Sequence, residues 1–385
     1  MAARVGPWLD RLSFFDVYSS PWFSAIYLLL FISLIGCVIP RARLHLRAMR
    51  AAPPRTPRRL ERLEEHVRFE APSGTSAEAT LQAARAELRR RHYRIADYEG
   101  SVSAERGYVA ETGNLVFHVS LLGLLVALAW GSLTTYSGQA VVVEGKTFAN
   151  VITQYDAFTA GPLVDTGSLP PFRFSLDSFR VEFETEAGGQ LGSPREFDAT
   201  LTVYDSPEAS PRTLTIRPNH PLDVNGTRAF LVGNGYAPII TVTDGQGNVA
   251  YRGPVITRPQ DGNYKSLAVV KVPDATPRQI ALVGVFLPTY DLQDGVPVSL
   301  FPQPLEPRLM VNVLLAAPGQ DGLEFRTGVP QSVMRLGGSM TTAKTADGQP
   351  LKVLLAPGTT APLPDGAGSV SFDGLTRYAA LDIRR

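Results

Sequence analysis

The sequence predicts a membrane protein with two transmembrane α-helices, a small cytoplasmic α/β segment and a large extracytoplasmic all-β, sandwich-like domain. Three observations lead to this fold class. Two long uncharged apolar runs lie in the first third of the chain, arginines crowd the stretch between them, and apolar residues alternate with period two beyond residue 134. The predicted order is an extracytoplasmic N-terminal segment (1–21), a transmembrane helix (22–39), a cytoplasmic basic α/β segment (40–112), a transmembrane helix (113–134) and an extracytoplasmic β-rich domain (135–385).

The first apolar run, Trp22 to Ile39, contains no charged residue. At about 1.5 Å per residue in a helix, it would cover about 27 Å, close to the hydrocarbon thickness of a bilayer. A cleaved signal peptide is the alternative. However, no basic segment leads into the run, and Pro40 and Arg41 follow it in place of a small-residue cleavage site. The run is therefore predicted to remain in the membrane.

The second run, Leu115 to Leu133, is also uncharged and carries Trp130 near its end, where aromatic residues border a bilayer. Arginines crowd the segment between the runs, whereas the first basic residue beyond Leu133 is Lys146. Because positively charged loops remain in the cytoplasm, residues 40–112 are predicted to be cytoplasmic and the C-terminal domain extracytoplasmic. The N-terminal segment must then also lie outside, an arrangement that a further helix upstream of Met1 would explain.

Within the cytoplasmic segment, Val67 to Ala71 alternates like a strand and Tyr93 to Tyr98 reads as a second strand. Between them, Thr75 and Glu78 form a capping box ahead of a helical pattern. The sequence thus predicts a small β-α-β unit, whose arginines lie against lipid headgroups or in water. We assign it no catalysis.

Strands with one buried face are predicted throughout the outer domain. The alternating sets are Phe172, Phe174 and Leu176; Phe179, Val181 and Phe183; Leu201 and Val203; Leu214 and Ile216; and Leu309, Val311 and Val313. Turn pairs such as Asp244-Gly245 and Asp294-Gly295 separate them. Because no long amphipathic helix intervenes, an antiparallel β-sandwich-like domain is expected.

Composition excludes several functions. A formal net charge of +1 gives no reason to expect a nucleic acid partner. Cys37 is the single cysteine, so the chain has no CxxC dithiol pair and no CxxCH haem-attachment motif. It is therefore neither a dithiol reductase nor a c-type cytochrome.

Several segments resemble the ResB-like family of System II cytochrome c biogenesis proteins. They are Phe15-Asp16-Val17-Tyr18-Ser19-Ser20-Pro21-Trp22-Phe23, Ile35-Gly36-Cys37-Val38-Ile39-Pro40-Arg41, Thr112-Gly113-Asn114-Leu115-Val116-Phe117-His118-Val119-Ser120-Leu121-Leu122-Gly123, Asn219-His220-Pro221-Leu222 and Gly233-Asn234-Gly235-Tyr236-Ala237-Pro238. That family has four membrane helices. Because only the middle two are visible here, the chain is expected to be truncated at both ends.

The resemblance implies a subunit of a haem-ligating complex in a bacterial plasma membrane, more than a free-standing enzyme. Its cargo would be haem b, held transiently and shared with a ResC/CcsA-type polytopic membrane protein. The complex would present haem to CxxCH apocytochrome c, and thioredoxin-like thiol reductants are further expected partners beside the lipid bilayer.

His118, in the second apolar run, is the candidate axial ligand of the haem iron. An ionisable residue within a membrane helix is a functional hypothesis by default, although a neutral imidazole can also simply join two helices by a hydrogen bond. The resemblance favours the ligand interpretation, with a second ligand supplied by the partner. Gly123, Ala127 and Gly131 form a small-residue seam on the side of the helix opposite His118. We expect the seam and the histidine to meet different neighbours.

His220 is a second candidate haem contact, but its position between Asn219 and Pro221 equally suits a turn. The remaining histidines, His45, His66 and His92, are expected to be solvated surface residues. No metal site other than the haem iron held by His118 is predicted.

Two other classes of function remain open. Leu163-Val164-Asp165-Thr166-Gly167-Ser168 matches the aspartic protease pattern, whose chemistry needs a second carboxylate, and only one copy is present. Alternatively, the helices could anchor a non-catalytic scaffold that displays the β-rich domain for protein binding, with His118 only packing against a neighbour.

Overall fold

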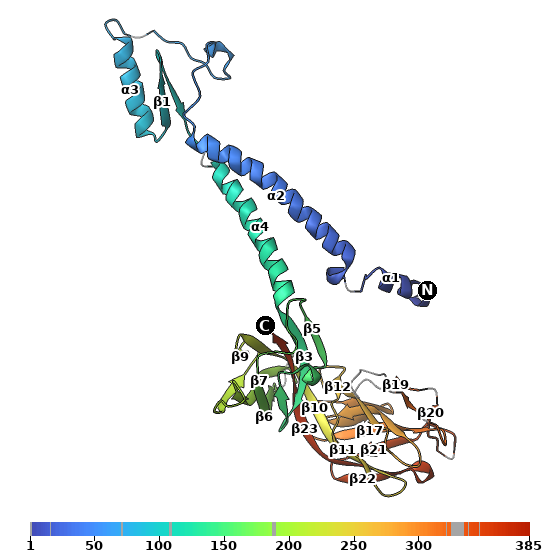
Figure 1. Cartoon of the computed structure of the whole chain (residues 1–385). Helices are drawn as coiled ribbons and strands as arrows, with labels where there is room; N and C mark the ends of the chain where they lie inside the picture. Colours follow the sequence, from blue (N-terminus) through green and yellow to red (C-terminus); the bar gives the residue numbers. More distant parts are fainter. Residues whose placement is uncertain are drawn as a thin grey trace. The chain divides into compact units, whose positions relative to one another are not determined.

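The computed structural model describes residues 2–15, 17–70, 72–107, 110–186, 190–320, 322–324, 335–337, 339–345 and 347–385. Asp16 and Ala71, which belong to segments discussed above, lie outside the described residues. The chain divides into two compact units, Met1–Ser132 and Leu133–Arg385, and each is described by itself. The first contains the apolar helices and the second is almost entirely β (Figure 1).

The first unit is built around two long helices. Its elements are α1 (Ala2–Arg11), η1 (Val17–Ser19), α2 (Pro21–Arg50), η2 (Leu60–Arg62), α3 (Ala77–Arg90), β1 (Arg94–Tyr98), β2 (Ser101–Glu105) and α4 (Ala110–Thr134). α2 begins where the sequence supplies a cap, because the hydroxyl of Ser20 accepts a hydrogen bond from the backbone N–H of Phe23 and Pro21 occupies the first turn. It continues past Pro40 and ends at Arg50, well beyond the predicted apolar span.

α2 and α4 are long and apolar enough to cross a membrane, and few of their side chains are buried. They run antiparallel. The hydroxyl of Tyr27, near the start of α2, donates to the carbonyl of Leu125 near the end of α4 at 2.5 Å. At the opposite ends, His45 Nε2 lies 2.8 Å from Thr112 Oγ1. The two predicted helices are thus present and joined to each other at two levels.

The segment between the helices is a helix followed by a hairpin, which corrects the predicted β-α-β unit. Residues 67–70 form no strand, because Val67 and Phe69 are exposed and no neighbouring strand pairs with them in the described chain. The cap of α3 is Ser76, not Thr75. The strand predicted near Tyr98 exists as β1, and it pairs antiparallel with β2 across a tight turn at Gly100, where φ is +70°.

The hairpin is fixed to the end of α2 by a cap. The guanidinium of Arg94 donates to the carbonyls of Ala48 and Met49, which the helix itself leaves without partners, and also pairs with Glu105 at 2.8 Å. The hydroxyl of Tyr98 donates to the carbonyl of Pro53 at 2.5 Å. The αββ segment therefore stabilises the last turn of α2.

The second unit is an antiparallel β structure, as predicted for this region. Its central sheet consists of β11 (Val249–Pro254), β10 (Thr227–Asp244), β23 (Gly368–Arg384), β3 (Tyr136–Val143) and β5 (Ala157–Ala160), with β9 (Leu222–Val224) and β22 (Thr359–Leu363) attached. A second sheet contains β4 (Thr147–Ala149), β6 (Arg173–Phe183), β7 (Pro194–Tyr204) and β8 (Arg212–Ile216). The third contains β12 (Arg258–Pro259), β13 (Ser266–Val272), β14 (Ile280–Leu287), β17 (Arg308–Ala316), β20 (Met340–Thr342) and β21 (Lys352–Leu355).

Smaller elements complete the second unit. They are the hairpins β15 (Tyr290–Gln293) with β16 (Val296–Ser299) and β18 (Leu323–Glu324) with β19 (Arg335–Leu336), and the short helices η3 (Ile152–Gln154) and η5 (Pro364–Gly366). The β15–β16 turn is the predicted Asp294-Gly295 pair, and both residues have positive φ, as such hairpin turns require.

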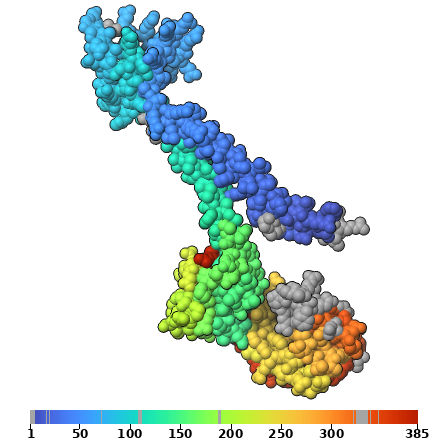
Figure 2. Space-filling model, viewed as in Figure 1, coloured from blue at the N-terminus to red at the C-terminus, as the bar shows by residue number. Residues whose placement is uncertain are grey.

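Two hydrophobic cores share the long strands β10 and β23. One core lies between one end of the central sheet and the second sheet, where Phe174, Leu201 and Leu381 are buried. The other lies between the opposite end and the third sheet, around Leu282 and Phe372. Figure 2 shows the corresponding halves of this unit as adjoining lobes, one green to yellow and one yellow to red. The second unit thus contains two sandwich-like cores, and both use the central sheet as one of their two layers.

A β-bulge explains a shift in the alternation seen in the sequence. Phe174 and Leu176 precede Phe179 and Val181 with an odd spacing, although all four are buried on the same side of β6. The register of β6 against β7 shifts between Leu176 and Ser178. The extra residue returns the apolar side chains to the core face.

Asp244 closes the turn between β10 and β11, and its ionisation is expected to make stability depend on pH. Its carboxylate accepts hydrogen bonds from the hydroxyl and N–H of Thr276 and from the N–H groups of Gln246 and Asn248. These bonds, that of the Thr276 hydroxyl above all, lower the pKa of Asp244 to about 2. Because folding lowers this pKa, the stabilisation is complete above about pH 4 and is lost as the pH falls toward 2.

We therefore expect Asp244→Asn to lower the melting temperature of the detergent-solubilised full chain at pH 6, and the difference from wild type to shrink between about pH 4 and pH 2. Circular dichroism at a series of pH values would measure it. Asp347→Asn, which changes an exposed carboxylate, is the matched control. A wild-type advantage that stays constant down to pH 2 would contradict the assignment.

Candidate functional site

The facing sides of α2 and α4 are marked by their partly covered residues. On α4 these recur every three or four positions and include Thr112, Leu115, His118, Leu122 and Leu125. On α2 the corresponding residues are Phe23, Tyr27, Phe31, Leu34, Val38, Ala42 and His45. Such spacing keeps each set on one side of its helix. His118 thus lies on the side of α4 that faces α2.

A groove of about 840 Å³ lies between these two helices. Its lining residues are Cys37, Val38, Arg41, Leu44, His45 and Ala48 from α2, and Asn114, Leu115 and His118 from α4. Four of these nine side chains are aliphatic, and the others are two imidazoles, a guanidinium, an amide and a thiol. This mixture suits an apolar ligand that also carries a metal and acidic groups.

The tautomer of His118 follows from its hydrogen bond. Nδ1 lies 2.8 Å from the carbonyl oxygen of Asn114, one turn earlier in α4. Because a carbonyl only accepts, Nδ1 must carry the proton, and in a neutral imidazole Nε2 then keeps its lone pair. A fixed Nδ1–H···O=C bond is also the usual support of a metal-binding histidine. The geometry therefore leaves Nε2 as the ring nitrogen that could coordinate a metal.

His45 is a residue that the sequence reasoning misjudged, because it was expected on the solvated surface. It is only 8% exposed, and its Nε2 bonds to Thr112 Oγ1 at 2.8 Å. The physical reason is that α2 does not end near Ile39. Val38, Ala42 and His45 recur at helical spacing on the side that faces α4, and this continued periodicity was a signal in the sequence.

The chain's own residues fit haem as a bound cargo. His118 offers one neutral imidazole nitrogen, which is a common axial ligand of haem iron. Val38, Leu44 and Leu115 supply apolar walls, and Arg41 supplies a cation. Among the described residues, no group of three or more His, Cys, Asp or Glu side chains could hold a metal ion by itself.

The small-residue seam of α4 lies away from this groove. A Cβ added to Gly123 or Gly131 would find no heavy atom within 4 Å in the described chain. The assignment of the seam to another helix therefore stays a prediction, as does its separation from the neighbours of His118.

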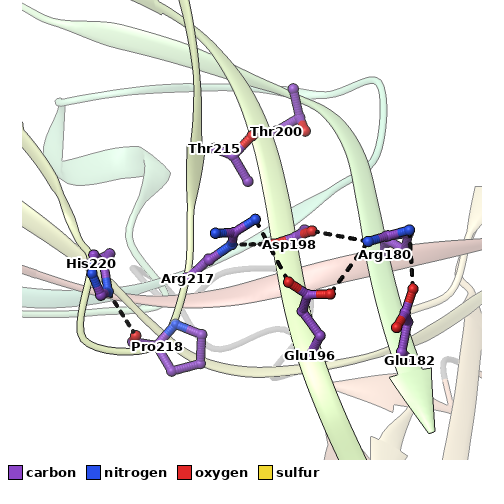
Figure 3. A network of polar contacts seen from close by, with 9 residues as sticks. All are labelled: Arg180, Glu182, Glu196, Asp198, Thr200, Thr215, Arg217, Pro218 and His220. Atoms are coloured by element: carbon purple, nitrogen blue, oxygen red, sulfur yellow. Dashed lines mark hydrogen bonds and ion pairs between the residues drawn. The ribbon is translucent and has the colours of Figure 1, made fainter.

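His220 lies in a tight turn at the edge of the second sheet. Its backbone pairs with Arg217, its Nδ1 lies 3.4 Å from the carbonyl oxygen of Pro218, and Asn219 adopts a positive φ of 66°. Figure 3 shows this turn beside ion pairs that join Arg180 and Arg217 to Glu182, Glu196 and Asp198. His220 is exposed, and it is the only histidine in the second unit. Its role as a haem contact stays a prediction, whereas its part in the turn is visible.

The ion pairs of this face belong to the sheet surface. Arg217 donates to Asp198 at 2.5 Å and lowers the pKa of that carboxyl group. Both arginines are more than half exposed, so water screens these ion pairs and each contributes little to stability. The network accounts for the local charges without a ligand.

Asp165 forms a turn within its own segment. Its carboxylate accepts the N–H of Gly167 at 3.0 Å and the hydroxyl of Ser168 at 2.6 Å, and these bonds lower its pKa. Aspartic protease chemistry instead needs two carboxylates that share a proton, which raises one pKa. These hydrogen bonds thus give the Asp165-Thr166-Gly167-Ser168 sequence a role as a turn, without protease chemistry.

Paired apolar helices with a groove between them, followed in the chain by a large antiparallel β unit, define the class of protein. The chain belongs to the ResB-like family, which matches residues 2–385. No solved structure matches the chain.

Curated relatives agree in their description. The chain is 27% identical over 338 residues to the cytochrome c biogenesis protein CcsB of Synechococcus sp. (strain WH7803), covering 85% of this chain and 70% of the relative. It is 26% identical over 345 residues to CcsB of Thermosynechococcus vestitus, covering 89% and 68%. A further CcsB, from Synechococcus sp. (strain JA-2-3B'a(2-13)), is 27% identical over 215 residues, which are 56% of this chain and 42% of the relative. The matches thus span between about two fifths and seven tenths of these relatives.

Proposed function

We propose that the chain is the ResB-like subunit of a System II cytochrome c biogenesis complex, which helps move haem across a bacterial plasma membrane. The observation that carries the proposal is the groove between α2 and α4, in which His118 presents Nε2. The family membership and the naming of the relatives support the same process.

The membrane arrangement proposed from the sequence has further support. Both helices have the length and composition of membrane spans. Exposed aromatic side chains, namely Trp8, Phe14, Phe15, Tyr18 and Trp22, cluster before and at the start of α2, as is typical of a membrane interface. We propose that residues 40–112 are cytoplasmic and residues 135–385 extracytoplasmic. His118 would then lie in the inner leaflet, near the cytoplasmic entry.

In this function the residues of the chain bind and orient haem b. Iron chemistry belongs to the haem, whereas His118 supplies one axial nitrogen and the aliphatic walls exclude water. A ResC/CcsA-type polytopic protein is proposed to supply the other iron ligand and to share the haem transiently. Apocytochrome c with a CxxCH site is the proposed recipient, and thioredoxin-like reductants would keep its thiols reduced.

The proposal is tested by deleting the gene in its host and staining c-type cytochromes for covalently bound haem. We expect the stain to disappear, and to return with the wild-type gene but not with a chain that lacks residues 135–385. Because attachment needs the whole complex, CxxCH apocytochrome should accumulate without haem. Normal staining in the deletion strain would refute the proposed function and favour the anchored scaffold.

The aspartic protease alternative is separated in the same strain. Asp165→Ala is expected to restore full haem staining, because Asp165 serves only a local turn. Loss of staining with a normally folded variant would reopen a role for this carboxylate.

A further inference from the structure

Arg41 lines the same groove as His118, although it belongs to the other helix. Val38, Arg41, His45 and Ala48 follow one another at spacings of three or four along α2, so they share the side that lines the groove. Arg43 and Arg47, by contrast, line a separate depression on another side of α2. The three arginines therefore have similar positions in sequence but different surroundings.

The charge of Arg41 has no acidic counterpart among the described residues. None of the ion pairs in the described part of the chain includes Arg41, whereas Arg85, Arg90 and Arg94 each pair with a carboxylate. Arg41 is exposed at the end of the apolar span, where a guanidinium reaches water or an anion. Arg41 is thus suited to an anionic ligand.

The shape of haem places its acidic groups at one edge, while its iron lies at the centre of the ring. In the groove, the candidate iron ligand His118 and the cation Arg41 are likewise separated along the helix axes. His45 bonds to Thr112, which precedes His118 by six residues, or about 9 Å along the axis of α4. Arg41 lies on the groove side of α2 one turn before His45. If His118 holds the iron, the ring edge directed toward His45 passes Arg41.

We infer that Arg41 binds a carboxylate of the haem whose iron His118 ligates. This orients the porphyrin with its acidic edge toward His45 and its apolar edge toward Val38 and Cys37. A guanidinium suits this task because it offers two parallel N–H donors to a carboxylate. The hydrogen bond of His45 to Thr112 holds the two helices together at that end, so His45 is a positioning residue here. The inference rests on the proposed function.

The test compares haemin with haemin dimethyl ester, which keeps the iron and ring but lacks the two negative charges. Both are titrated into the full-length chain in phosphatidylcholine nanodiscs, and the Soret band reports binding. We expect wild type to bind haemin more tightly than the ester. Arg41→Gln should weaken haemin binding about tenfold or more and leave ester binding unchanged. Arg43→Gln, the matched loss of charge outside the groove, should change neither.

Several outcomes would overturn the inference. If Arg41 only supported the local structure, Arg41→Gln would weaken the binding of haemin and of its dimethyl ester alike. If the partner of Arg41 were a lipid phosphate, wild type and Arg41→Gln would bind haemin with equal affinity. That equality would persist when the titration is repeated in phosphatidylglycerol nanodiscs. Equal wild-type affinity for the two probes, with a Soret band that still depends on His118, would reject the carboxylate contact but keep the proposed function. Absence of any His118-dependent band would reject the proposed function itself.

Discussion

Replacement of His118 by alanine is expected to remove most of the haem absorption from the proposed complex with a ResC/CcsA-type protein, while leaving that complex assembled. Alanine has no coordinating atom, and His45 cannot readily take over because its Nε2 is bonded to Thr112. The other two histidines of the first unit, His66 and His92, are exposed and do not line the groove. The measurement is the Soret absorbance per mole of purified complex.

Chemical rescue separates ligation from packing. His118→Gly with added imidazole should regain part of the Soret band, because free imidazole can enter the vacated space and coordinate the iron. His66→Ala, a histidine loss at the exposed surface, should retain the full band. Unchanged haem content in His118→Ala would show that His118 only packs between helices. A loss of the partner subunit from the purified complex would point to an assembly role instead.

The amino-acid pattern predicted the large elements of this fold because each depends on local periodicity. The two apolar helices are visible as uncharged runs of residues, and most of the buried strand residues, from Phe174 to Val313, are visible as local alternation. The strand predicted at 67–71 is absent at 67–70, the described part of that segment, because periodicity alone does not make a strand. A half-buried strand needs alternating apolar residues, but it also needs a neighbouring strand to pair with. In the structure, β1 pairs with the adjacent β2 and not with residues 67–70.

Long-range contacts explain what the sequence could not predict. β10 and β23 pair along nearly their whole lengths, although more than a hundred residues separate them, and this pairing creates the sheet shared by both cores. The segment 233–238, noticed only as a family resemblance, lies in the middle of β10. There Tyr236 donates to the carbonyl of Pro302, and Gly235 leaves space for the ring of Tyr378. These contacts give the segment a structural role.

The candidate site was half predictable for the same reason. His118 stands out because a histidine within an apolar run is rare. His45 and Arg41 instead look like members of a basic surface segment, and only the continuation of α2 to Arg50 brings them to the groove. The basic composition of this segment therefore suggested a solvated surface, although helical spacing places Arg41 and His45 on the side of α2 that lines the groove.

Gly284→Ala is expected to destabilise the second unit strongly. Gly284 lies in β14 between β13 and β17, and its partner in β17 is Val311. A Cβ on Gly284 would lie 1.9 Å from the carbonyl oxygen of Met310 and 2.6 Å from the Cα of Val311. Both are backbone atoms of a paired strand, so no side-chain rotation relieves the overlap, and the strands must separate. We expect a loss of about 3 kcal/mol or more in the free energy of unfolding.

Urea unfolding of the detergent-solubilised full chain, followed by the β signal in circular dichroism, measures this effect. Gly262→Ala is the matched control, because no heavy atom lies within 4 Å of its added Cβ and its φ is not in the left-handed region. That control should shift the unfolding midpoint little or raise it slightly, since alanine restricts the unfolded chain. If both variants unfolded at the same urea concentration, β14 and β17 would have to be farther apart at Gly284 than the register implies. The close pairing that completes the second core would then be wrong at this position.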